Sequence, residues 1–405
     1  MASVTATTRR LRKCGAVFSK GRSIVLLGVV MMMVATGVYI HTHPAPNVDT
    51  MAVYTPSPTH PSRTPMALAP YSADRASRDH DVATTKKTLL PSRKKIVYFC
   101  EGVCGGWADR QKGIVGAYVL AAMLDRDFRV HISFPCDLGL FMAPNKVDWR
   151  VNAAELSGQN VKKYITQDQD SVNFALQLVQ TEDLRQKLSD DVTVLTWNME
   201  VVKYLRQHEL ASRVGWMAGK TVPEIFSQAL RDIFTLSHDV QDALNTFHKS
   251  VPADTKLICA QMRLGNRPGF PDAVLSYMHT VQQFPVLVNF LSTYNHSKNY
   301  RIFVASDSDE IVSMAKREFP EVILSIPGPI THIDNTRGLT ACDGFKKAIL
   351  DEYALSECDV LIISESGLGK VASFLRGSDR ELYLFHDDKI ERFTMDGVFP
   401  NKDGW

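Results

Sequence analysis

The sequence lacks a strong excess of charge, a zinc-binding cysteine motif and an internal repeat. Its 46 basic and 44 acidic residues leave a formal net charge of +2, so charge gives no argument for a nucleic-acid partner. It has no CxxC pair and no histidine pair beside its clustered cysteines, which disfavours structural zinc. No repeat of solenoid or propeller period is present. The remaining composition is ordinary for a globular protein, and 405 residues have room for two domains.

A stretch without charge lies near the start of the chain. Residues 23–40 (SIVLLGVVMMMVATGVYI) contain no charged side chain, six basic residues precede them, and no Lys or Arg follows until Arg63. This asymmetry predicts a cytosolic tail at residues 1–22, a transmembrane signal-anchor at 23–40 and a lumenal remainder. A cleaved signal peptide is the alternative, with Ala35-Thr-Gly37 as a poor cleavage site.

Residues 41–94 are rich in Pro, Ser and Thr and poor in large apolar side chains. Such a composition cannot bury a core, so it predicts an extended stem. A tail, an anchor, a stem and a large domain resemble the layout of a type II Golgi glycosyltransferase, although anchored hydrolases and sulfotransferases share it. The predicted location is therefore the Golgi membrane, with the folded part in the lumen.

The cysteines fit this location. Cys14 lies in the predicted tail, and the other six of the seven lie in the part predicted to be lumenal, where disulfides form. Cys100 and Cys104 are close enough in sequence for a local bridge, whereas the remaining pairing cannot be assigned from sequence. The sequon Asn295-His-Ser297 falls in a polar break between a predicted helix and a predicted strand.

The folded part begins with one βαβ unit. A strand at 96–100 leads through a glycine-rich loop at 101–110 into an apolar helix at 114–124 and a strand at 128–134. Gly105 and Gly106 would let the backbone approach a ligand, and Asp109 would cap the helix. A tight turn without a ligand is the alternative. Gly113 and Gly116 lie on one helix face, where they allow close packing against the sheet.

The middle of the chain is less regular. Residues 192–197 predict a strand, and residues 222–234 and 236–247 predict helices. Trp197 and Trp216 are interpreted as packing residues rather than as platforms for an acceptor, because large aromatic side chains are usually part of the core.

From Pro252 onward, strands and helices alternate regularly, which predicts a doubly wound parallel sheet. Together with the first unit this gives an α/β fold with two facing Rossmann-like domains, an acceptor-side domain at 95–250 and a nucleotide-sugar donor domain at 251–405. The predicted strands are 257–262, 301–305, 322–324, 360–363 and 381–385, and the predicted helices are 272–291 with a break near Pro285, 309–319, 344–358 and 367–376.

Polar groups follow three of these strands, where ligands of open α/β sheets bind. Gln261-Met-Arg263 carries a guanidinium that can hold a phosphate through two hydrogen bonds. Ser306-Asp-Ser-Asp309 follows the next strand, and Ser364-Glu-Ser-Gly-Leu-Gly-Lys370 places hydroxyls and glycines at a helix N-terminus, a ready phosphate site. The alternatives are a surface salt bridge for Arg263 and simple helix capping for the serines.

Asp307 and Asp309 form a DxD pattern that could chelate Mn²⁺ or Mg²⁺. Capping of the following helix by Asp309 explains the pattern without a metal. The preferred interpretation is a site without a metal, because Arg263 and the helix N-terminus already supply positive charge.

These residues resemble the motifs of the fucosyltransferase superfamily that includes α1,2-, α1,6- and protein O-fucosyltransferases. The family motif His-x-Arg-x-Gly-Asp is similar to Gln261-Met-Arg263-Leu-Gly-Asn266, where Gln261 and Asn266 depart from it; Gln-x-Arg resembles the plant α1,2 branch. The second and third motifs are similar to Phe303-Val-Ala-Ser306-Asp307 and to Ser364-Glu-Ser366-Gly-Leu-Gly369. The loop Gly105-Gly-Trp-Ala-Asp109-Arg110 resembles the first-domain loop of the family, and the resemblance covers residues 95–385.

The resemblance implies a GT-B fold and an inverting, metal-independent transfer of L-fucose from GDP-fucose, the donor substrate, to a glycan or glycoprotein hydroxyl, without a cofactor. Arg263 would stabilise the charge that develops on the β-phosphate. Gly105, Gly106, Gln261, Ser306, Ser364, Ser366 and Gly367 would contact the donor, and Asp307 the nucleoside. Asp109, Glu101 and Asp272 are candidates for a base. A transferase for another nucleotide sugar and an inactive sugar-binding relative remain as alternatives.

Overall fold

The computed structural model describes residues 93–151, 158–265, 278–294 and 299–401. The chain divides into two units, residues 1–67 and 68–405, and every described residue belongs to the second. The predicted anchor at 23–40, nearly all of the stem, the sequon at Asn295, and the site candidates Asn266 and Asp272 lie outside the described residues. None of the described helices combines the length and apolar character that a membrane crossing requires.

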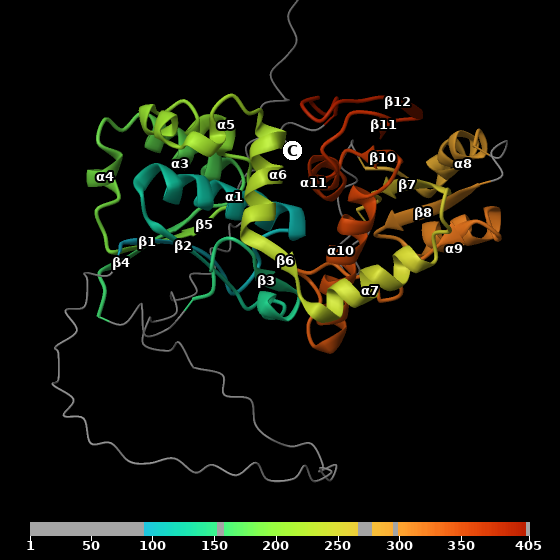
Figure 1. Cartoon of the computed structure of the whole chain (residues 1–405), viewed down its shortest axis with the longest axis horizontal. Helices are drawn as coiled ribbons and strands as arrows, with labels where there is room; N and C mark the ends of the chain where they lie inside the picture. The colour runs from blue at the N-terminus through green and yellow to red at the C-terminus, as the bar shows by residue number, and fades with distance from the viewer. Residues whose placement is uncertain (1–92, 152–157, 266–277, 295–298, 402–405) are drawn as a thin grey trace, which may run out of the picture. The chain divides into compact units, whose positions relative to one another are not determined.

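The first sheet is parallel, with strand order β2-β1-β5-β4 (Figure 1). Ile96, Tyr98 and Cys100 of β1 join the main core, whereas Val97 packs on the other face with Val192 and Val194 of β5. A central strand buried on both faces in this way needs apolar side chains at successive positions. The strands are β1 Lys95–Cys100, β2 Asp127–Ile132, β4 Val161–Ile165 and β5 Val192–Thr196.

The predicted βαβ unit is confirmed, but its helix α1 (Trp107–Leu124) begins at Trp107 rather than at residue 114. The predicted helix began only after the polar run Arg110-Gln-Lys112, which is nevertheless buried. Glycine packing is confirmed as well, because a Cβ on Gly113 would lie 2.1 Å from the carbonyl oxygen of Trp197. The Trp197 indole donates to the Gly113 carbonyl at 2.7 Å, so Trp197 is a core residue as expected.

The second sheet has strand order β12-β11-β10-β7-β8-β9 and is parallel except for β12. The predicted parallel sheet is therefore confirmed, whereas the antiparallel edge strand β12 was not predicted. The strands are β7 Lys256–Met262, β8 Tyr300–Ser306, β9 Ile323–Leu324, β10 Val360–Ser364, β11 Leu382–His386 and β12 Lys389–Arg392.

The helices follow the predicted alternation with shifted ends. Helix α10 begins at Leu339 rather than at residue 344, and Leu236 belongs to a short strand rather than to the helix that follows it. The described part of the predicted helix at 272–291 is helical only from Val281 onward. The remaining elements are η2 Leu138–Leu140, β3 Met142–Pro144, α3 Gln169–Val179, α4 Leu184–Lys187, α5 Val202–Leu205, η3 Glu209–Arg213, η4 Gly215–Met217, α6 Val222–Ile233, β6 Phe234–Leu236, α7 His238–Lys249, η5 Val281–Gln283, α8 Phe284–Ser292, α9 Asp309–Glu318, α10 Leu339–Ser356 and α11 Gly367–Arg376.

The two sheets share one hydrophobic core, which contains residues of α1, α6 and β1 together with residues of α10, α11 and β10. Three disulfides link Cys100 with Cys104, Cys136 with Cys342, and Cys259 with Cys358. The predicted local bridge is thus present, and the second bridge joins the segment after β2 to α10. The division into domains near residue 250 falls between the two sheets and stays a prediction.

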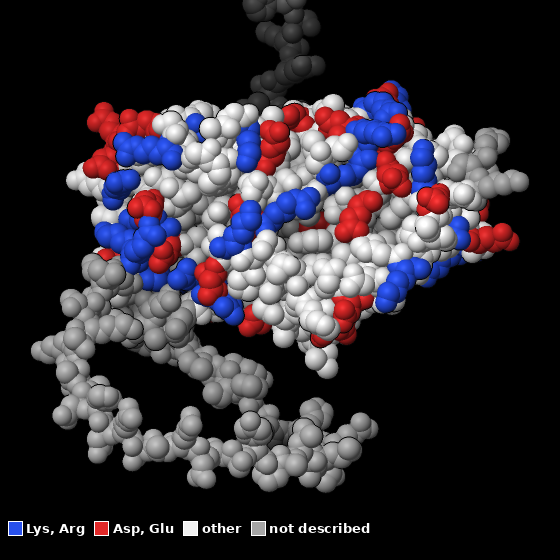
Figure 2. All heavy atoms as spheres, in the orientation of Figure 1, with Lys and Arg blue, Asp and Glu red and all other residues white. Residues whose placement is uncertain are grey.

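Basic and acidic side chains are interspersed over the face of the molecule that Figure 2 shows. This distribution agrees with the small formal net charge of +2.

Glu352 of α10 is a fully buried carboxyl group between α10 and α1. Its Oε1 accepts hydrogen bonds from the Trp107 indole at 3.2 Å and from the Gln111 amide at 2.6 Å. Neither its Oε2 nor Oε1 of Gln111 has a hydrogen-bond partner among the described residues. Burial raises the pKa of Glu352 to about 8, so this carboxyl group is mainly protonated at neutral pH.

We expect Glu352 to make stability depend on pH. Its pKa is about 8 in the folded chain against an ordinary value of 4.5, so the folded state holds a proton that the unfolded state loses between these values. The contribution of Glu352 to stability is therefore largest below pH 4.5 and falls by up to about 1.4 kcal/mol per pH unit as the pH rises toward 8. Glu352→Gln, which stays neutral, should flatten this slope in urea unfolding at pH 5 to 8. The exposed Glu321→Gln is the matched control, and equal slopes in all three proteins would contradict the assignment.

Candidate functional site

The three polar strand ends lie together at one edge of the second sheet. Strands β10, β7 and β8 are neighbours and parallel, so their carboxyl ends meet. The Ser306 hydroxyl donates to the Met262 carbonyl at 2.8 Å, and the Arg263 amide donates to the Ser364 hydroxyl oxygen at 3.1 Å. The structure thus brings together the three groups that the sequence singled out.

Gln261 fixes the contact between the ends of β7 and β10. Its Oε1 accepts from the Ser364 hydroxyl at 2.7 Å and from the Ser364 amide at 3.3 Å. A Cβ on Gly369 would lie 2.9 Å from this oxygen and 2.8 Å from Cβ of Ile363, so the start of α11 can approach only without a side chain there. Gln261, Ser364 and Gly369 therefore set the position of the loop that follows β10.

Asp307 binds the turn that follows β7. Its carboxylate accepts from the amides of Leu264 and Gly265, both at 2.8 Å, and lies 2.9 Å from the Arg263 guanidinium. Gly265 has φ of +76°, a conformation that glycine adopts without strain. Asp307 also lines the pocket at this edge of the sheet, and its expected contact with the nucleoside stays a prediction.

The same geometry disagrees with a metal at the DxD pattern. Three N–H donors converge on Asp307, including a guanidinium, and this is an environment that a cation would not share. The predicted cap is also corrected: Ser308 caps α9 by accepting from the Ile311 amide at 3.5 Å, and Asp309 is an exposed residue of the first turn. No group of three metal-binding side chains occurs among the described residues.

The N-terminus of helix α11 and Arg263 line the same pocket. Ser366 occupies the N-cap position, but its side chain makes no capping hydrogen bond, so capping does not explain this serine. Gly367 lies against α1, since a Cβ there would come 3.0 Å from Cβ of Ala108 and 3.9 Å from Oδ1 of Asp109. The positive end of the helix dipole therefore lies at the wall of a pocket that Arg263 also lines, an arrangement that favours an anion.

A pocket of about 110 Å³ lies at this edge. Lys347 and Asp351 of α10 form one wall, with Lys347 Nζ 2.7 and 2.8 Å from the two oxygens of Asp351. Burial raises the pKa of Asp351, while the neighbouring Lys347 opposes that rise. The other lining residues are Gln261, Arg263, Ala305, Ser306, Asp307, Pro329, Ile330, Thr331, Gly344, Ala348, Ser366 and Leu368.

Lys347, Asp351 and Thr331 were missed by the reasoning from sequence. A signal was present, because Lys347 and Asp351 are oppositely charged, four positions apart and therefore on one face of a helix whose other residues are largely apolar. Thr331 lies in the connection after β9, which has no regular structure to indicate its direction.

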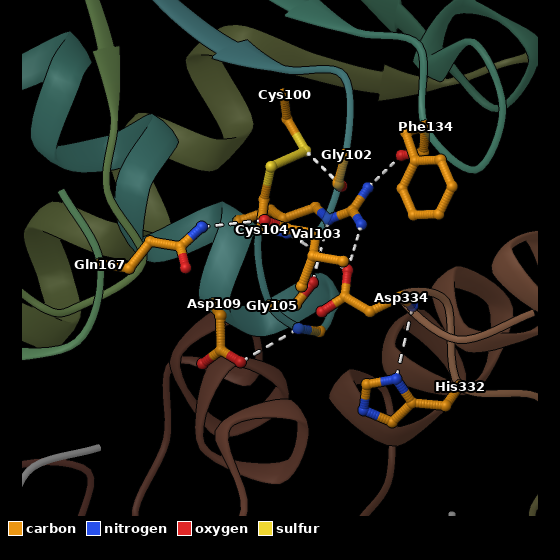
Figure 3. Close-up of polar contacts among 12 residues, drawn as sticks. Cys100, Gly102, Val103, Cys104, Gly105, Asp109, Phe134, Gln167, His332 and Asp334 are labelled. Atoms are coloured by element: carbon orange, nitrogen blue, oxygen red, sulfur yellow. Dashed lines mark hydrogen bonds and ion pairs between the residues drawn. A yellow bond between two sulfur atoms is a disulfide. The ribbon is translucent and has the colours of Figure 1, made fainter. Parts of the chain in front are cut away.

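The glycine loop of the first sheet is rigidly built (Figure 3). The Cys100–Cys104 disulfide closes it, and Asp109 accepts from the Gly106 amide at 3.1 Å. Asp109 therefore braces the start of α1 from its third position, while Gly106 is the N-cap. Oδ1 of Asp109 also lies 2.8 Å from Nζ of the buried Lys112.

A buried ion pair connects this loop to the pocket. Arg110 is 2.8 Å from Asp334, and their side chains are 0% and 6% exposed. Asp334 also accepts from the Cys104 amide at 3.3 Å, and Figure 3 shows it approaching the loop from a different segment of the chain. Since Asp334 follows the pocket-lining residues Pro329–Thr331 closely in sequence, the pair anchors one wall of the pocket on the first sheet.

Two of the three candidate bases can be placed. Asp109 lies near the N-terminus of α11, as the contact with Gly367 shows. Glu101 is paired with His131 at 2.9 Å beyond the end of β1. Asp272 lies outside the described residues.

The comparisons with known proteins come from structure alone, since no family model and no curated protein matches the sequence. A mutant of FUT1 from Arabidopsis thaliana in complex with GDP has a TM-score of 0.52 at 12% identity, covering 72% of this chain and 70% of that one. The α1,6-fucosyltransferase NodZ, which comes from Bradyrhizobium, was soaked with GDP-fucose; it gives 0.49 at 12% identity, covering 73% and 95%. POFUT1 in complex with GDP gives 0.40 at 11%, covering 72% and 99%. The likeness to FUT1 shows a shared fold.

The Arg110–Asp334 pair should be important for stability. Asp334→Ala leaves a buried guanidinium without its partner, and this should lower the free energy of unfolding by about 3–5 kcal/mol. Asp148→Ala removes the exposed pair between Asp148 and Arg150, 2.8 Å apart, and is the matched control, with little expected effect. Urea unfolding of both variants measures the difference. Equal stability of the two would show that the buried pair is not needed.

Proposed function

We propose that this protein is an inverting glycosyltransferase that moves L-fucose from GDP-fucose to a hydroxyl of a glycan or glycoprotein. One observation carries the proposal: the Arg263 guanidinium and the N-terminus of α11 converge on a pocket whose far wall holds a buried carboxylate, Asp351. Arg263 and the helix N-terminus suit a diphosphate. The Asp351 carboxylate suits a nucleotide base that carries hydrogen-bond donors. The fold shared with FUT1 supports the class.

Arg263 is the group that acts on the leaving diphosphate. As the bond from fucose C1 to the β-phosphate oxygen breaks, negative charge grows on that phosphate, and a guanidinium beside it stabilises the transition state more than the ground state. The Asp307 carboxylate positions Arg263 at 2.9 Å and fixes the adjacent turn. The amides at the start of α11 supply further donors, so the reaction needs no metal for charge stabilisation.

Asp351 and Lys347 suit the Watson–Crick edge of guanine. That edge presents two donors, N1–H and the 2-amino group, beside the acceptor O6. A carboxylate accepts from the donors, and an ammonium group donates to the oxygen. Adenine presents the opposite order at these positions, and uracil has no 2-amino group, so this wall favours GDP over ADP and UDP.

The acceptor hydroxyl attacks fucose C1 from the side opposite to the departing GDP and gives its proton to a base. Asp109 is a candidate for this base, because it lies in the first turn of α1 near the N-terminus of α11. Glu101 with His131 is the second candidate. A loose transition state needs only modest help from either group.

The proposed location is the Golgi membrane, with residues 23–40 as a single-pass anchor and the folded part in the lumen. The charge asymmetry around 23–40 supports it. Disulfides pair all six cysteines of the described residues, in keeping with an oxidising compartment.

The proposal is tested by thermal shift of the purified protein with GDP, GDP-fucose, UDP and CMP. GDP and GDP-fucose should raise the melting temperature, whereas UDP and CMP should not. Stabilisation by UDP alone would identify another nucleotide sugar as the donor, and stabilisation by none would refute the proposal. Binding of GDP without transfer to any member of a glycan array would identify an inactive relative, for which Asn266 in place of the family aspartate is the motive.

Arg263→Ala should lower kcat by about 10²- to 10³-fold, because it removes a group that stabilises the developing charge. Radiolabelled fucose transfer measures the rate, and far-ultraviolet circular dichroism checks the fold. Arg317→Ala, an exposed arginine of α9, is the matched control. A near-normal rate for Arg263→Ala would contradict the assigned role. In a separate measurement, the wild-type protein should keep its full rate in EDTA.

Asp351 should determine the choice of base. Inosine diphosphate lacks the 2-amino group, so the wild-type protein should bind GDP about tenfold or more tightly than IDP, as the loss of one hydrogen bond to a charged group implies. Asp351→Asn should bring the two dissociation constants close together. Glu352→Gln, the neighbouring residue that faces α1, should leave the ratio unchanged. An unchanged ratio in Asp351→Asn would place the base elsewhere.

A further inference from the structure

The segment after β12, Phe393–Asn401, packs against the start of α11; we name it the C-terminal strap. The Phe393 amide donates to the Leu382 carbonyl at 3.0 Å, and the Met395 amide donates to Asp379 at 2.7 Å. The rings of Phe393 and Phe399 stack with centroids 5.9 Å apart. These contacts hold the strap in one path over the loop and helix turn Ser364–Lys370, which we name the phosphate turn.

Lys370 connects the strap to the far end of the phosphate turn. A lysine that follows glycines at the start of a helix commonly binds phosphate, but this side chain is 1% exposed and its ammonium donates to the Gly397 carbonyl. The ammonium lies 4.4 Å from the ring centroid of Phe393 and 5.1 Å from that of Phe399. Lys370 therefore serves the strap rather than the pocket.

Glu365 connects the strap to the near end of the phosphate turn. It lies between Ser364 and Ser366, and its carboxylate accepts from the Asn401 amide at 3.0 Å and from the Asn401 side chain at 3.1 Å. Asn401 also donates to Asp387 at 3.0 Å, so its side chain is held from two sides. Hydrogen bonds to a carboxylate are stronger than those between neutral groups.

We infer that the C-terminal strap positions the phosphate turn for the donor diphosphate. The strap forms hydrogen bonds with the turn at both ends, at Glu365 and at Lys370. The backbone amides between these residues therefore stay oriented toward the position of the bound anion. These residues touch no reacting atom; they are positioning residues, and preorganised donors depend on such support. The inference rests on the proposed donor site.

The first measurement is independent of any nucleotide. Hydrogen–deuterium exchange of the peptide that covers 364–370 is followed in the free protein for Asn401→Ala and Lys370→Met. Exchange should become about tenfold faster in each variant, because the loss of a hydrogen bond to the strap makes local opening of the phosphate turn about tenfold more frequent. The matched control is Val398→Ala, a strap residue whose side chain is 80% exposed. Unchanged exchange in both variants would overturn the inference.

The second measurement separates a positioning role from a merely structural one. Both variants should bind GDP about tenfold more weakly while their affinity for guanosine stays the same, because only the phosphate contacts depend on the turn. Asn401 is exposed, so Asn401→Ala should also keep its melting temperature. Equal GDP affinity in the variants overturns the inference alone. Failure of the intact protein to bind GDP overturns the proposed function, and with it the donor role of the strap.

Discussion

The site depends on the Ser364 hydroxyl, which is hydrogen-bonded in two directions. It donates to Gln261 at 2.7 Å and accepts from the Arg263 amide at 3.1 Å, so the ends of β7 and β10 cannot shift relative to each other without breaking a buried hydrogen bond. A buried polar group left unpaired costs about 1–3 kcal/mol. This constraint fixes both the strand end that carries Arg263 and the loop that leads into α11, and the convergence of guanidinium and helix N-terminus follows from it.

The first sheet supports the same pocket through buried charge. Arg110 holds Asp334, and thereby the connection after β9 that lines the pocket. Gly367 and Gly113 show how closely α1 approaches α11 on one side and its own sheet on the other. The residues that line the pocket thus come from the unit of the second sheet, whereas α1 of the first unit holds one of its walls in place. This contact explains why Arg110 of α1 is buried.

Much of the second sheet and of its candidate site could be predicted from sequence. Buried parallel strands are recognised as short apolar runs, and the polar residues at their carboxyl ends meet at one edge of the sheet. Arg263, Ser306 and Ser364 were found in this way. Lys347 and Asp351 were not, because a charged pair on a helix is usually solvated and only tertiary packing buries this one. Asp307 was identified, but its hydrogen bonds to two amides could not be predicted, because those amides belong to the turn after a neighbouring strand.

Other features could not be predicted from sequence for similar reasons. The start of α1 was placed too late because Arg110 and Lys112 look like surface residues until Asp334 and Asp109 are known to pair with them. The pairing of Cys136 with Cys342 joins positions far apart in sequence. Lys370 resembles a phosphate ligand in sequence, and only the path of the strap shows its other partner.

The central claim is that Arg263 and the N-terminus of α11 bind the diphosphate of a guanine nucleotide. A crystal structure of the protein with GDP tests it most directly. The account predicts phosphate oxygens within hydrogen-bond distance of the Arg263 guanidinium and of the first amides of α11, with the base against Asp351. GDP bound at another place, or bound here with its phosphates turned away from Arg263, would contradict it.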